Sequence, residues 1–466
     1  MYTDVMTEIA RFKAGRIHVA RAGLATQARL CVDMLQQGRG MAWVVKNRDE
    51  LLTARALMRL FSPELSSGDF LPDALDKGGW TSLPPFSPRS ANREGWTERL
   101  SALYALRSGQ AKGLILTADN LLPKLVPLDF FENREVTLIR GEDVSLDMIL
   151  EQAVEWGYER VSMVSNPGEI ARRGDILDIM PPGYDKPIRL DFFGDLIEEI
   201  RLFDPVSQRS KANLSEVRVL PVSPIRQSPA DQAKMQARWK SLFQKNMLTE
   251  NERFGLTRLQ EQGDFRLLPG CCYDTATNLE AWLPADTVWV LPGLSDFRDM
   301  LSSAERLWTE AFEAQDVEGR PQPQRLAMRE ASDVESACER FACVHAEPLV
   351  MGIAKGIHDL PERSLSSFED LFPSTAEQDR PWQTLVQALK RWQNDKRQTI
   401  LCFASEKSRT KFLNLASQDG LSPLLRYSGE QHGLFALVAP FRAGAELIWD
   451  QSLILGEDLL QPQSVL

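Results

Sequence analysis

The stretch that decides the fold runs from residue 188 to residue 203 and reads Ile188-Arg-Leu-Asp-Phe-Phe-Gly-Asp-Leu-Ile-Glu-Glu-Ile-Arg-Leu-Phe203. Two runs of alternating apolar and polar side chains meet at Gly194-Asp195, a pair that is typical of tight turns. The stretch therefore predicts a β-hairpin. Side chains at every second position of each strand should share one face of the resulting sheet.

The two faces of the first strand differ in character. The apolar face consists of Ile188, Leu190 and Phe192, and the opposite face consists of Arg189, Asp191 and Phe193. If the apolar face packs on a helix, an exposed aromatic stands beside an arginine on a rigid sheet, which is typical of a protein-interaction hot spot. The alternative is a solvated face whose arginines pair locally with Asp191, Glu198 or Glu199.

The register of the second strand depends on the turn. Ile200 and Leu202 face one way and Arg201 faces the other. Aligning Ile200 and Leu202 with Leu190 and Phe192 requires a three-residue turn or a bulge, because a strict two-residue turn shifts the register by one residue. The facing of Arg201 therefore stays open at this point.

The regions around the hairpin predict an α/β protein. Apolar runs at 41–45 and 113–117, with amphipathic stretches at 48–61 and 94–107, are typical of strands and helices in a parallel sheet. From residue 135 to 213 one helix and several short strands indicate a small α+β domain inserted into that unit. We expect three domains: domain 1 at 1–134 and 214–338, domain 2 at 135–213, and a second small α/β domain, domain 3, at 339–466.

Composition narrows the classes of function. The 466 residues hold 54 Lys+Arg against 65 Asp+Glu, a net charge of −11, and residues 135–213 hold 9 against 16. Such a balance disfavours a broad surface that grips nucleic acid, because that surface needs a basic face. No apolar run is long enough to span a bilayer, so we expect no membrane contact. The six cysteines lack metal-ligand spacing and predict buried, reduced thiols in a cytoplasmic protein, with no metal site.

A nucleotide site is incomplete in this sequence. Phosphate binding by a parallel α/β domain needs a glycine-rich turn that ends in Lys-Ser/Thr at a helix N-terminus. The nearest counterpart is 19–30, which keeps Gly23 and Thr26 but has no lysine between them. We therefore expect domain 1 to be a degenerate P-loop fold with no catalytic residue and no bound cofactor. A nucleotide-dependent enzyme with unorthodox phosphate binding is the alternative.

The motifs of the central region resemble a known family. These motifs are Arg173-Gly-Asp-Ile-Leu-Asp-Ile179, Arg189–Phe193 and Phe203-Asp-Pro-Val-Ser-Gln-Arg-Ser210, with supporting matches at Arg99-Leu100 and Asp129–Phe131. Over about residues 85–210 the chain resembles the N-terminal part of bacterial transcription-repair coupling factors, which is similar to the helicase subunit UvrB. The resemblance implies a helicase-like domain 1 without ATPase motifs. It also implies that domain 2 binds UvrA through Arg173, Arg189, Phe193 and Arg201.

The same resemblance implies a role for the chain. Family members recruit UvrA to stalled RNA polymerase in transcription-coupled nucleotide excision repair. They continue beyond such a region into an RNA-polymerase-interacting domain and a translocase on double-stranded DNA that uses ATP and Mg²⁺, and the motifs of those parts are not in this sequence. Departures from the family pattern fall at Ile170, Arg172 and Met180. Domain 3 reads as a spacer, and a weak DNA-binding scaffold is a further alternative.

Overall fold

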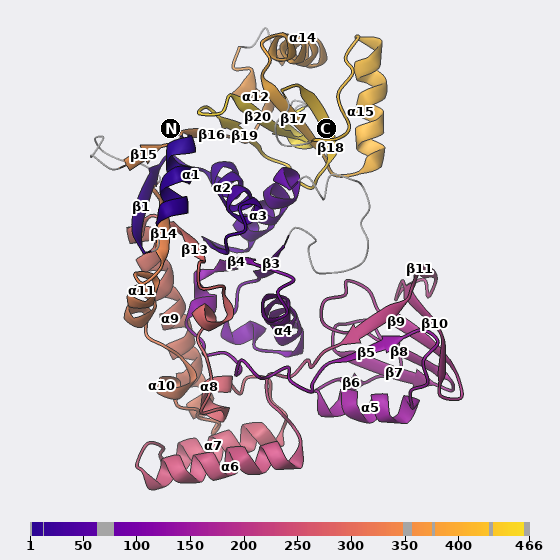
Figure 1. Cartoon of the computed structure of the whole chain (residues 1–466), viewed down its shortest axis with the longest axis vertical. Coiled ribbons are helices and arrows are strands. Elements are labelled where there is room, and N and C mark those ends of the chain that lie inside the picture. Colours follow the sequence, from indigo (N-terminus) through magenta and orange to yellow (C-terminus); the bar gives the residue numbers. More distant parts are fainter. Residues whose placement is uncertain are drawn as a thin grey trace.

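A computed structural model describes residues 2–12, 14–62, 79–347, 357–374, 378–427 and 432–460. Its largest sheet has seven parallel strands in the order β15-β1-β14-β13-β2-β4-β3 (Figure 1). The strands are β1 (Gly15–Ala20), β2 (Met41–Val45), β3 (Trp80–Leu83), β4 (Gly113–Thr117), β13 (Val288–Pro292), β14 (Ala342–Glu347) and β15 (Ile357–Asp359). The prediction of an α/β protein with a parallel sheet is confirmed.

Helices cover both faces of this sheet. They are α1 (Tyr2–Arg11), α2 (Leu24–Gln36), α3 (Arg48–Phe61), α4 (Arg93–Arg107), α9 (Leu294–Val317) and α11 (Ala331–Cys338). Alternate residues of β2 enter different cores: Met41, Trp43 and Val45 pack with α2 and α3, whereas Ala42 and Val44 pack with α4 and α9. A strand buried on both faces reads as a continuous apolar run, which explains why β2 was recognisable in the sequence.

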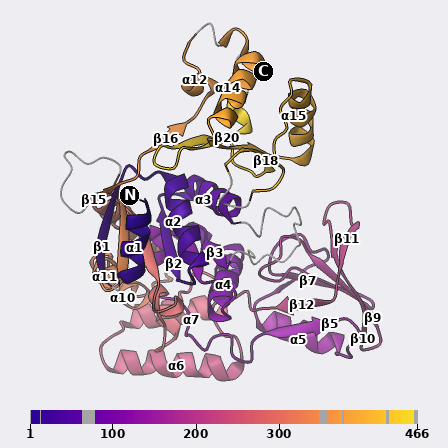
Figure 2. The same ribbon diagram turned by 45° about the horizontal axis from the view of Figure 1, so that its top comes forward.

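The inserted domain holds one helix, α5 (Leu146–Glu155), against a six-stranded sheet of order β11-β10-β9-β8-β7-β6. Its strands are β6 (Glu159–Arg160), β7 (Glu169–Arg173), β8 (Ile176–Ile179), β9 (Ile188–Phe193), β10 (Leu196–Phe203) and β11 (Ser210–Leu214). In Figures 1 and 2 it lies beside α4. Arg93 of α4 forms an ion pair with Glu159 at this contact.

The chain enters and leaves the inserted domain through one antiparallel pair, β5 (Val136–Ile139) and β12 (Glu216–Val219), in which Val136 lies opposite Val219. Val217, Val219 and Val222 share the core of α5. The predicted end of domain 2 at 213 therefore falls before strand β12, which packs with the insert. After β12 come the two polar helices of the hairpin α6 (Pro229–Gln244) and α7 (Glu250–Glu261), and later the short helices α8 (Pro269–Cys272) and α10 (Gln324–Ala327).

The C-terminal part forms a five-stranded mixed sheet of order β16-β19-β20-β17-β18, covered by α14 (Pro381–Asn394) and α15 (Glu406–Gln418). The strands are β16 (Glu362–Leu365), β17 (Gln398–Phe403), β18 (Leu434–Val438), β19 (Gly444–Leu447) and β20 (Ser452–Gly456), and α12 (Phe368–Leu371) follows β16. The predicted start of domain 3 at 339 differs from the strand arrangement, because β14 and β15 pair with β1 in the seven-stranded sheet.

One hydrophobic core joins the two α/β units. Ile400, Phe435 and Ile454 of the five-stranded sheet belong to the same cluster of buried side chains as α2 and α3. All six cysteines are buried and none forms a disulfide, as the sequence predicted. Within the described part of the chain, no helix combines the length and apolar character that crossing a membrane requires.

Candidate protein-binding face of the inserted sheet

The inserted sheet has an apolar inner face and a charged outer face. The inner face packs on α5 through Ile170, Leu177, Ile179, Ile188, Leu190, Phe192, Ile200 and Leu202. Because side chains alternate along a strand, the outer face carries the residues between them. All four residues predicted to bind a partner lie on this outer face: Arg173, Arg189, Phe193 and Arg201.

The hairpin resolves the open register. Phe193 pairs with Leu196 across a two-residue turn, and the ladder then shifts between Ile197 and Glu199. This bulge restores the register, so that Arg201 lies opposite Arg189 on the outer face. The predicted need for a bulge is confirmed.

The bulge sets which apolar residues face one another across the hairpin. Ile200 lies opposite Leu190 and Leu202 lies opposite Ile188, so both share the inner face with Leu190 and Phe192, as the sequence predicted. Phe192 lies opposite Ile197, because the bulge comes after this pair and not within the turn.

Arg189 is held by the sheet itself. Its Nε and Nη2 donate to the two carboxylate oxygens of Asp178 at 2.7 and 2.8 Å, and Nη2 also donates to Gln208 Oε1 at 3.1 Å. The guanidinium lies over the Phe203 ring, 4.5 Å from its centroid. Hydrogen bonding to Asp178 holds the pKa of Arg189 above its ordinary value. The Asp178 side chain is only 2% exposed, so this pair is part of the structure of the sheet.

Arg201 and Arg173 are held less completely. Arg201 forms an ion pair with Asp191, and its Nε lies 3.4 Å from Glu199 Oε2. The local pairing considered as the alternative in the sequence analysis is therefore present for Arg201, whose partners are Asp191 and Glu199. Arg173 is exposed and donates from Nε and Nη2 to the carbonyl of Ser162 at 3.2 and 2.6 Å, which leaves the rest of its guanidinium turned to solvent.

Phe193 is the apolar feature of this face. Its side chain stands at the end of β9 and is 75% exposed, whereas Phe192 beside it is 5% exposed and lies in the core. Gly194 follows with φ of +63°, a left-handed conformation that glycine adopts at little cost. The turn therefore presents Phe193 at the edge of a face on which Arg189 is held by Asp178.

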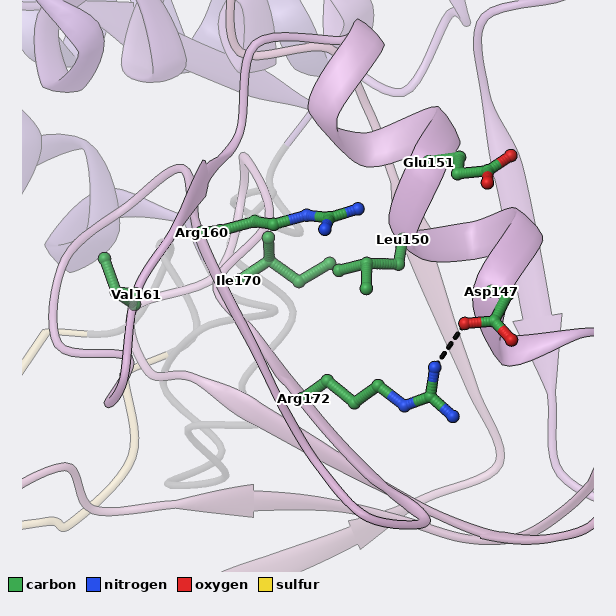
Figure 3. Close-up of a pocket in the computed structure, with 7 residues that line it drawn as sticks. All are labelled: Asp147, Leu150, Glu151, Arg160, Val161, Ile170 and Arg172. Carbon is green, nitrogen blue, oxygen red and sulfur yellow. Dashed lines mark hydrogen bonds and ion pairs between the residues drawn. The ribbon is translucent and has the colours of Figure 1, made fainter.

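A second feature, which sequence reasoning did not find, lies on the α5 side of the sheet. An open groove of about 490 Å³ is lined by Asp147, Leu150, Glu151, Arg160, Val161, Ile170 and Arg172 (Figure 3). Arg172 crosses to α5 and forms an ion pair with Asp147. Arg172, which departs from the family pattern, therefore uses its charge to pair with α5 of the same domain. The groove depends on how α5 sits over β7, which no local motif encodes.

Comparison with known proteins first gives the class of this module. Residues 136–224 match the UvrB interaction domain family. The matched segment begins at β5 and ends just after β12, so it covers the whole inserted sheet and α5.

The relatives give the kind of protein. The chain is 32% identical over 237 residues to a transcription-repair-coupling factor of Myxococcus xanthus, a match that covers 48% of this chain and 19% of the relative. It is 33% identical over 168 residues to that of Escherichia coli (35% and 14%) and 42% identical over 128 residues to that of Staphylococcus aureus (27% and 11%). The chain is homologous to the N-terminal region of transcription-repair coupling factors, and its matches span about a fifth or less of these relatives' length.

Proposed function

We propose that this chain recruits UvrA in transcription-coupled nucleotide excision repair, and that the outer face of the inserted sheet is the binding surface. Phe193 supports this proposal most directly. It is a large apolar side chain, 75% exposed, and it lies inside the segment that matches the UvrB interaction domain. Burial of an aromatic anchor in a partner's pocket is the usual centre of a protein interface.

The roles of the four candidate residues differ on this proposal. Phe193 is the anchor and Arg173 supplies a charge that is open to solvent. Arg189 and Arg201 stiffen the face through Asp178 and Asp191, so that little side-chain entropy is lost on binding. Arg189 can still offer its remaining N–H groups to a partner carboxylate, because its side chain is 19% exposed.

The test is a calorimetric titration of purified UvrA into the chain. We expect Phe193→Ala to weaken binding by about 2 kcal/mol, roughly 30-fold. The matched control is Met148→Ala on α5, since Met148 is 70% exposed and lies on the other side of the same domain. Equal affinity of the two variants would place the interface elsewhere.

The first α/β domain has no catalytic role on this proposal. It is a helicase-like fold with a degenerate P-loop, and the chain binds neither ATP nor Mg²⁺. Contacts to RNA polymerase and duplex DNA, and ATP hydrolysis, belong to other parts of a coupling factor, which acts in the cytoplasm. ATPase activity of the purified chain that is lost on substitution of Thr26 would contradict this assignment.

A further inference from the structure

The first βα turn of the seven-stranded sheet has the geometry of an anion site. β1 ends at Ala20 and α2 begins at Leu24, with Gly23 as the N-cap in an extended conformation. The first N–H groups of a helix have no partner within the helix, and with the helix dipole they favour a negative charge. In parallel α/β sheets this position, beyond the carboxyl end of a strand, commonly holds a phosphate.

The position is already filled by a carboxylate of the same chain. Glu362, the first residue of β16, accepts hydrogen bonds from the backbone N–H of Ala25 at 3.2 Å and of Thr26 at 2.7 Å. Both donors belong to the first turn of α2. A Cβ at Gly23 would overlap it, so the glycine kept from the phosphate-binding pattern allows the carboxylate to approach.

The segment that carries Glu362 is fastened across the turn by its backbone. Leu360 N–H donates to the Ala20 carbonyl at 3.1 Å, and Glu362 N–H donates to the Arg21 carbonyl at 3.0 Å. These two backbone hydrogen bonds hold residues 360–362 against the turn, so the main chain itself fixes the place of the Glu362 carboxylate.

The same turn carries a second contact from the five-stranded sheet. Trp449, which follows β19, donates from its indole N–H to the Thr26 hydroxyl at 3.0 Å. Its ring stacks on Tyr2 of α1, with centroids 4.3 Å apart. Two separate segments of the C-terminal unit thus meet at the N-terminus of α2.

We propose that Glu362 is an internal anion that takes the place of a phosphate at the start of α2, so that it both closes the first sheet to nucleotides and latches the C-terminal sheet onto it. Burial raises the pKa of the Glu362 carboxyl, against the lowering effect of its hydrogen bonds to Thr26 and Ala25. The carboxylate is thus costly to bury anywhere without such donors. This inference is independent of UvrA binding, because it concerns a different sheet.

The test compares thermal unfolding of the full chain, Glu362→Ala and Asp359→Ala, each with inorganic pyrophosphate or with sodium chloride at equal ionic strength. Asp359→Ala is the matched control, since it removes a neighbouring acid whose ion pair with Arg21 is exposed. We expect Glu362→Ala to lower the midpoint by about 3 °C or more. Pyrophosphate should restore roughly half of that loss in Glu362→Ala. It should leave the other two proteins unchanged.

Each other outcome overturns the proposal. A wild-type midpoint raised by pyrophosphate would show that the site is open. Equal midpoints for Glu362→Ala and Asp359→Ala would show that the carboxylate is no latch, and no recovery with pyrophosphate would show that it does not stand in for a phosphate. If Glu362→Ala does not fold, Glu362→Gln sets an amide against one of the two backbone donors. Glu362→Gln should then unfold at a lower denaturant concentration than Asp359→Ala, and pyrophosphate should not change that concentration.

Discussion

The outer face of the inserted sheet and the first turn of the seven-stranded sheet both concentrate charge, yet they present opposite surfaces. On the inserted sheet, arginines are paired by Asp178 and Asp191, while Phe193 is left in solvent. At the turn, the backbone N–H groups of Ala25 and Thr26 at the start of α2 are occupied by Glu362. On the inserted sheet, ion pairs within one face leave a surface that a partner protein can bind. At the turn, a carboxylate from a distant strand occupies a site that an anionic ligand could otherwise bind.

The largest loss of stability should come from Arg189→Ala, which breaks the ion pair that fixes the outer face of the inserted sheet. Asp178 would keep a carboxylate that is 2% exposed without its guanidinium, and loss of one member of a buried pair costs about 3 to 5 kcal/mol. We expect the free energy of unfolding in urea to fall by that order. Arg189→Ala with Asp178→Asn should recover part of the loss, because the buried charge is removed as well. If Arg189→Ala unfolds like the wild type, the face is not fixed by this pair.

Phe193→Ala should separate binding from stability. With a side chain that is 75% exposed, its removal should change the free energy of unfolding by less than about 0.5 kcal/mol. Affinity for UvrA should still fall by about 2 kcal/mol. Urea unfolding of the Phe193→Ala variant without UvrA measures the change in its free energy of unfolding. A clear loss of stability would mean that Phe193 packs within the chain and would weaken its assignment as an anchor.

Acidification from pH 7.5 to pH 5.5 should act on the seven-stranded sheet rather than on the insert, because histidine titrates in this interval and residues 136–224 contain no histidine. Burial lowers the pKa of His345 in β14 from 6.5, against a hydrogen bond to the Pro292 carbonyl. The unfolded state therefore binds the proton more readily, so stability is present above pH 6.5 and is lost as pH falls below it.

Urea unfolding at pH 7.5 and pH 5.5 measures this loss. His345→Gln should lose less stability than the wild type over that interval. The exposed His432 supplies the control, His432→Gln, which should behave as the wild type does. Identical pH dependence of the two variants would show that burial of His345 is not the cause.

The smallest effect on stability should come from Arg173→Ala. This residue is exposed and bonds only the Ser162 carbonyl among the described residues, so we expect a change within about 0.5 kcal/mol. Its effect should appear in the salt dependence of UvrA binding, measured by titration at two ionic strengths. Arg173→Lys keeps the charge and should retain that dependence. An unchanged salt dependence in Arg173→Ala would remove Arg173 from the interface.

Local patterns were sufficient for much of the fold. The strands expected at 41–45 and 113–117 are β2 and β4, and the helix expected at 48–61 is α3, which begins after an Asn47 cap. Buried strands and capped helices carry their signal in neighbouring residues. The alternation of the hairpin likewise placed Arg189 and Phe193 on one face.

Contacts between distant segments could not be predicted in the same way. Glu362 meets Thr26 across 336 residues, and β14 joins a sheet that the sequence assigned to an earlier domain. The partner of Arg189 is Asp178 rather than a neighbour in the hairpin, because that pair depends on the register of β8 against β9. Such choices are made by packing and not by local propensity.

The pairing of β5 with β12 has a consequence for how such a module can travel between proteins. Since Val136 lies opposite Val219, the two ends of the segment emerge side by side and together occupy the room of a single surface loop. A gene that acquires this segment in place of one loop gains a complete sheet with its helix and core, while the host sheet keeps its own strand order. The segment can therefore be inserted at a single surface loop of a recipient protein.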